Sequence, residues 1–93
     1  MNNKERVRAI EYQLIKSLQP DQLIVSDDSA AHIGHAGAQS GAGHFSVAIT
    51  AKDFENKSLP ERHRMVYAAV KDLMDSEIHA LSIQAKAPSE TKS

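Results

Sequence analysis

The stretch SLPERHRMVYAAVKDLMDSEIHALSIQA, residues 58–85, decides the fold. Ser58 is suited to cap a helix, because Glu61 stands three residues later to complete a capping box and the proline between them is tolerated in a first turn. An apolar stripe at helical spacing follows: Met65, Val66, Ala69, Val70, Leu73 and Met74. We therefore expect one helix to about residue 75 and then a strand over residues 78–85.

Three further elements precede this stretch. Apolar residues recur at helical spacing near the N-terminus: Val7, Ile10, Leu14 and Leu18. They predict a helix over about residues 3–18, which Pro20 ends. A β-branched run at 23–25 and an alternating segment at 44–50 predict two strands. Residues 29–43 contain all four glycines, so we expect a long, mobile and functional loop there.

The predicted order of elements defines an α+β domain. A three-stranded sheet backed by helices on one face is the economical way to cover both apolar stripes. The last strand follows a helix, so we expect it to run parallel to one strand of the hairpin and to give a mixed sheet. The chain is expected to form a single domain over residues 1–88, with a frayed polar tail at 89–93.

Composition excludes several classes of function. Eleven Lys and Arg against twelve Asp and Glu give a net charge of −1, which supplies no global attraction for nucleic acid or anionic lipid. Because cysteine is absent, the chain cannot supply a disulfide, a thiol nucleophile or a thiolate ligand. No Ser–His–Asp order or close carboxylate pair stands out, so we do not expect an enzyme. The charged N-terminus and the lack of a bilayer-spanning apolar stretch predict a cytoplasmic protein without a membrane partner.

The histidines are the main candidates for chemistry. His32 and His35 lie in the glycine-rich segment at a spacing compatible with chelation, although two solvent-exposed loop histidines give the same pattern. His79 shares strand parity with apolar positions, as expected of a core or rim histidine, and its place at the start of the strand also permits it to meet a loop histidine. Paired histidines also favour adventitious binding of zinc, nickel or copper.

Basic residues gather around the helix that begins near residue 59. They are Lys57, Arg62, His63, Arg64 and Lys71. Such a group can contact a phosphate backbone or an acidic partner surface, and a solvated helix face explains it equally well. The chain has only two Phe and two Tyr, so aromatic residues for base stacking are scarce.

Two blocks of this sequence, RHRMVY (residues 62–67) and IHALSI (residues 78–83), closely resemble BolA proteins. The segment from His35 to Phe45 adds to the resemblance, which spans roughly residues 7–88. It implies a fold like that of class II KH domains, in the order helix, strand, strand, helix, helix, strand, with a short extra helix or turn near residues 52–54. Asn56 stands where many members have glycine.

The resemblance implies a non-catalytic adaptor. BolA-like proteins pair with monothiol glutaredoxins and share a [2Fe–2S] cluster with them in cluster assembly, trafficking or iron sensing. The family's C-terminal histidine falls on His79, and its loop ligand falls on His35, with His32 in reserve. A glutaredoxin cysteine and a glutathione thiolate would complete the set, and Arg62 and Arg64 would suit a surface that carries anionic glutathione.

The alternative that the family offers is a DNA-binding transcriptional regulator of cell morphology and stress response. In that case the region of the second helix, with its basic residues, would contact DNA.

Overall fold

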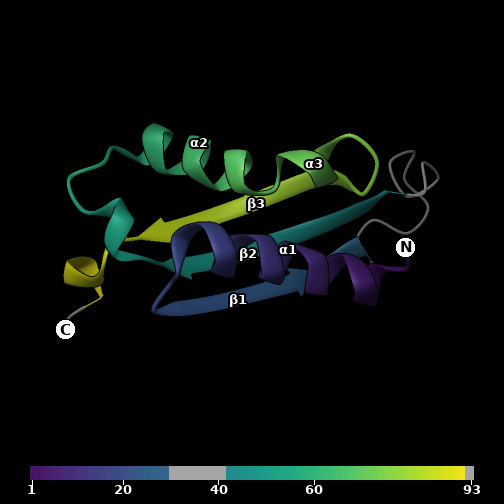
Figure 1. Ribbon diagram of the computed structural model, residues 1–93, viewed down its shortest axis with the longest axis horizontal. Helices are drawn as coiled ribbons and strands as arrows, with labels where there is room; N and C mark the ends of the chain where they lie inside the picture. Colours follow the sequence, from purple (N-terminus) through teal and green to yellow (C-terminus); the bar gives the residue numbers. More distant parts are fainter. Residues whose placement is uncertain (30–41, 92–93) are drawn as a thin grey trace.

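Three strands form one mixed sheet in the computed structural model, which describes residues 1–29 and 42–91 (Figure 1). The strand order is β1 (Gln22–Asp27), β2 (Gly43–Thr50), β3 (Ile78–Lys86). β1 pairs antiparallel with β2, and β3 pairs parallel with β2 on its other side. The predicted α+β class and the mixed sheet are therefore confirmed, whereas most of the predicted loop between β1 and β2 lies outside the described residues.

Capping boxes begin the two longer helices. α1 (Asn3–Leu18) is capped by Asn2, whose side chain accepts a hydrogen bond from the backbone N–H of Glu5. α2 (Leu59–Ala69) is capped in the same way by Ser58 and Glu61, as the sequence predicts. Each box satisfies backbone donors that a helix start leaves open.

The expected long helix is divided into two. α2 ends at Ala69, and the four-residue α3 (Lys71–Met74) follows after Val70, whose φ of −106° and ψ of 16° leave the helical region. Val70 and Leu73 are both buried, so the apolar period continues through the break and conceals it in the sequence. The prediction of one helix to about residue 75 is therefore wrong at Val70.

The core lies between the helices and one face of the sheet. Phe45, Val47 and Ile49 of β2 are 2% exposed or less and form one cluster with buried residues of α1 and α2. The other face is open, because Ile24 of β1 is 65% exposed and Ser82 of β3 is also exposed. None of the helices in the part of the chain that the structure describes is long and apolar enough to cross a membrane.

Residues 51–58 connect β2 to α2. They contain the short 3-10 helix η3 (Lys52–Phe54), where the resemblance places an extra helix or turn, and the side chain of Phe54 is fully buried. Asn56 has a φ of 63°, in the left-handed region that glycine adopts freely and asparagine adopts more readily than most residues. Asparagine therefore meets the backbone requirement at this position.

The chain after β3 is held to the domain up to residue 91. Ala87 is 1% exposed, and the 3-10 helix η4 (Pro88–Glu90) follows it. Glu90 accepts hydrogen bonds from Arg62 and from the backbone N–H of Ala87, while Ser89 bonds Glu55. The predicted fraying is therefore wrong for residues 89–91, because these polar side chains have partners; residues 92–93 lie outside the described residues.

Candidate metal centre

Two histidine rings lie side by side at the edge of the sheet where β2 and β3 begin. Gly43 lies opposite Ile78, but His44 lies opposite Ala80, so His79 is an extra residue at a shift in the register. Such a bulge changes the direction in which a side chain points. The ring centroids of His44 and His79 are 4.9 Å apart, and their planes are tilted by 45°.

The bulge also decides the exposure of His79. Strand parity predicts that His79 shares a face with Leu81 and Ile83, which are half-buried, yet His79 is exposed. That part of the prediction is wrong, because strict alternation fails where the register shifts. Its imidazole is consequently open to a ligand or partner from outside the chain.

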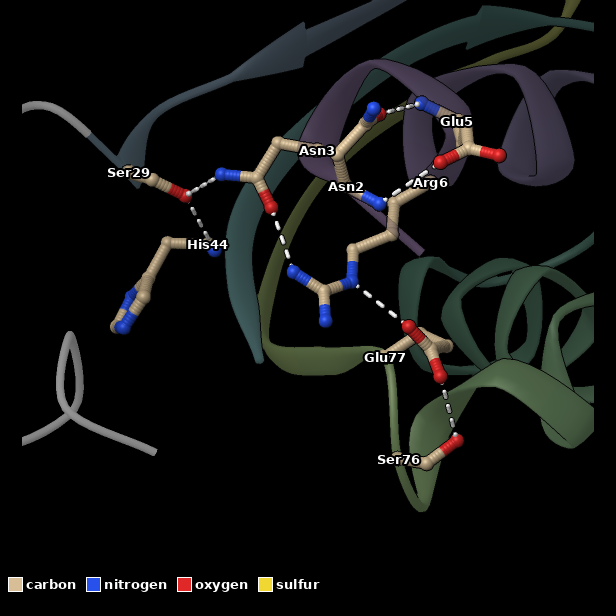
Figure 2. Close-up of polar contacts among 8 residues, drawn as sticks. All are labelled: Asn2, Asn3, Glu5, Arg6, Ser29, His44, Ser76 and Glu77. Atoms are coloured by element: carbon tan, nitrogen blue, oxygen red, sulfur yellow. Dashed lines mark hydrogen bonds and ion pairs between the residues drawn. The ribbon is translucent and has the colours of Figure 1, made fainter. Parts of the chain in front are cut away.

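A chain of polar contacts runs from β2 across α1 to the turn before β3 (Figure 2). Ser29 Oγ accepts hydrogen bonds from the backbone N–H of His44 and from Asn3 Nδ2, both at 3.1 Å. Asn3 Oδ1 accepts one from Arg6 Nη1 at 2.8 Å, and Arg6 Nε donates to Glu77 Oε1 at 2.8 Å. The contacts join the backbone at His44 to the residue two positions before His79.

A backbone hydrogen bond also links the start of β2 directly to the turn before β3. The carbonyl of Glu77 accepts a hydrogen bond from the N–H of Gly43 at 3.1 Å. The side chains of Arg6 and Glu77 are only 14% and 19% exposed, and the hydrogen bond from Arg6, with a second from Ser76, holds the pKa of Glu77 below its usual value. Glu77 therefore stays charged at neutral pH and keeps both strand starts attached to α1.

The sequence assigned His44 only a polar position in an alternating strand. A usable signal was present, because two parallel strands start at one edge of a sheet and their first residues become neighbours. His32 and His35 lie outside the described residues, so the expected meeting of His35 with His79 stays a prediction. In the described ranges 1–29 and 42–91, no group of three or more His, Asp or Glu side chains is arranged to hold a metal.

Arg62 does not belong to the predicted basic surface. It is 6% exposed, and its guanidinium donates to the carbonyls of Lys57 and Ala85 and to the carboxylate of Glu90. The prediction that Arg62 contacts a partner or nucleic acid is therefore wrong, because its donors are used inside the domain.

The remaining basic residues lie on different parts of the surface. Lys57 and Arg64 are exposed and line one shallow pocket together with Glu61. Hydrogen bonds from Ser58 hold the pKa of Glu61 below its usual value, and the charges of Lys57 and Arg64 lower it further. His63 instead lines a groove between α2 and β3, and Lys71 is exposed on α3. Of the predicted basic residues that are exposed, Lys57 and Arg64 are the two that line one pocket together.

Comparison with known proteins decides the family. The sequence pattern described as BolA-like protein matches residues 14–90. This chain belongs to the BolA-like family. The recognition made from the blocks at 62–67 and 78–83 is thereby confirmed.

Relatives of this BolA-like chain differ in length and in name. The chloroplastic protein BOLA1 of Arabidopsis thaliana is 40% identical over 93 residues, which cover 97% of this chain and 58% of that relative. This chain thus spans little more than half of the relative's length. The DNA-binding transcriptional regulator BolA of Haemophilus influenzae is 31% identical over 83 residues, covering 89% of this chain and 78% of the relative.

A solved structure supports the same fold. The BolA domain of SufE1 from Arabidopsis thaliana has a TM-score of 0.82 and 42% sequence identity, and the match covers 92% of this chain and 95% of that one. The α+β fold with a three-stranded mixed sheet is therefore that of BolA-like proteins.

Proposed function

We propose that this BolA-like chain is a non-catalytic cytoplasmic adaptor that shares a [2Fe–2S] cluster with a monothiol glutaredoxin. The observation that carries the proposal is the exposed imidazole of His79, at the edge of the sheet and inside the segment that matches the family. Imidazoles can replace thiolates as ligands of one iron of such a cluster. A chain without cysteine must take thiolate ligands from elsewhere, here a glutaredoxin cysteine and glutathione.

His79 supplies one imidazole in this proposal, and His35 supplies the second, with His32 in reserve. Replacing two thiolates with neutral imidazoles raises the reduction potential of the cluster and makes its binding depend on proton concentration. Arg64, which is exposed, is suited to contact the anionic glutathione, and Arg62 is withdrawn from that role because it is buried.

The test is co-purification with a monothiol glutaredoxin in the presence of iron, sulfide and glutathione. The mixture is expected to form a complex with the visible absorption of a histidine-ligated [2Fe–2S] cluster. His79→Ala should abolish or reshape that spectrum, since one ligand to iron is lost. His63→Ala is the matched control and should retain most of it, because His63 lies in the groove between α2 and β3. An unchanged spectrum in the His79 variant would refute the assignment.

DNA binding is the second candidate. It is favoured by the exposed pair Lys57 and Arg64 at the start of α2, and by the name of the Haemophilus influenzae relative. We expect a regulator to bind duplex DNA with an affinity that falls as salt rises and falls again in the double variant Lys57→Ala/Arg64→Ala. Arg8→Ala, which removes an exposed cation from α1, serves as the control. Binding that both variants leave intact would exclude this surface as the DNA contact.

A further inference from the structure

We propose that His44 and His79 together form a site at which the isolated chain binds one divalent transition-metal ion of the Zn²⁺, Co²⁺, Ni²⁺ and Cu²⁺ class. Imidazole suits these ions, and the two rings come from neighbouring parallel strands. The inference goes beyond the proposed cluster sharing, because it needs neither a partner protein nor the segment between residues 30 and 41.

The spacing of the rings fits a shared ion. When two imidazoles bind one ion, each metal–nitrogen bond is about 2.0–2.1 Å long. With a nitrogen–metal–nitrogen angle of roughly 90–110°, the two ring centroids then lie about 4.5–5.2 Å apart. The centroids of His44 and His79 are 4.9 Å apart, and their 45° tilt differs from a parallel stack. The centroid spacing is therefore that of two imidazoles on one ion, with the strands in their present register.

The backbone under the rings is fixed before any ion arrives. The N–H of His44 is bonded to Ser29, and the N–H of the preceding Gly43 is bonded to the carbonyl of Glu77. The Arg6–Glu77 ion pair anchors that turn to α1. A site on strands that are held in this way loses little conformational freedom on binding, which favours affinity.

Two imidazoles leave part of the metal's coordination shell open. His79 is exposed, so water or an outside ligand can reach the remaining positions. The site is then of the open kind, in which the ion exchanges ligands, and not a closed structural site with four protein ligands. The class of ligand that it takes is a borderline divalent cation with water or a small donor completing the shell.

The test is titration of the isolated chain with Zn²⁺ and with Co²⁺ at neutral pH, followed by calorimetry and by the visible spectrum of cobalt. We expect one ion per chain. Because the ligands lie on two strands of the folded sheet, the ion should also raise the midpoint of thermal unfolding, on the order of 5–10 °C at about ten times the dissociation constant.

Five variants decide whether these two rings are the ligands. His44→Ala and His79→Ala should each weaken binding at least about tenfold, and His44→Gln should do the same if the alanine variant folds poorly. His63→Ala should bind as the unchanged chain does. Binding that survives in both His44 variants, or that is lost in the double variant His32→Ala/His35→Ala instead, would overturn the proposal. The titration contains no glutaredoxin, so a failure of this metal-site proposal would leave the proposed cluster sharing standing.

Discussion

Replacing Arg62 with alanine is expected to lower the free energy of unfolding by about 2–4 kcal/mol. Arg62 Nε donates to the carbonyl of Lys57 at 3.0 Å, and Nη1 donates to the carbonyl of Ala85 at 3.1 Å and to Glu90 Oε1 at 2.5 Å. The variant removes these charge-assisted bonds and the packing of a side chain that is 7% exposed. Urea denaturation followed by circular dichroism measures the loss.

Arg64→Ala is the matched control, because Arg64 is exposed two residues further along the same helix. We expect it to change stability by no more than about 0.5 kcal/mol. Arg62→Lys should recover only part of the loss, since an ammonium group lacks the planar fork that reaches several acceptors. Glu90→Gln should cost less than about 1 kcal/mol, because the Glu90 side chain is 48% exposed. Equal and small losses in the two arginine variants would contradict a structural role for Arg62.

Arg62 is buried and Arg64 is exposed, and the sequence does not predict this difference. Residues two apart on a helix point in nearly opposite directions, so Arg62 and Arg64 could not share one surface. Which of them points inward depends on its partners, and Glu90 lies 28 residues away along the chain. The errors about Arg62 and about the frayed tail thus have one cause, a contact between distant segments that no local pattern records.

The fold itself was largely predictable, because its signals are local. The bounds of α1, the capping box of α2 and the alternation along β2 follow from residue type and spacing, and the parallel pairing of β3 follows from the helix that precedes it. The break at Val70 was hidden for the opposite reason. The helices before and after Val70 bury apolar residues with an unbroken period. Only the backbone angles of Val70 show that one helix ends and another begins.

The candidate metal centre was half predictable. His79 was identified through its block in the sequence, and it is exposed, so an ion or a partner from outside the chain can reach it. Its neighbour His44 was overlooked, since the register shift that brings the two rings together leaves no trace in the alternation of residues. Parallel pairing alone would have placed both near one edge of the sheet.

Phe45→Ala is expected to lower the free energy of unfolding by about 3–5 kcal/mol. Phe45 is 1% exposed in the central strand, directly after His44. Its ring fills the space up to the backbone of Gly43, where an added Cβ would lie 2.4 Å from the ring. A chain of this length has about 5–14 kcal/mol of stability in all, so the variant should be near the limit of folding.

Urea denaturation at several temperatures measures this loss, and Tyr12→Ala provides an aromatic control. Tyr12 is 60% exposed on α1, so its removal should change stability by no more than about 0.5 kcal/mol. Gly43→Ala should be destabilising by about 1–3 kcal/mol, because the added Cβ would lie 2.4 Å from the ring of Phe45, which is 1% exposed. If Phe45→Ala instead lowered the free energy of unfolding as little as Tyr12→Ala, the Phe45 ring could not be the buried contact that stabilises the start of β2.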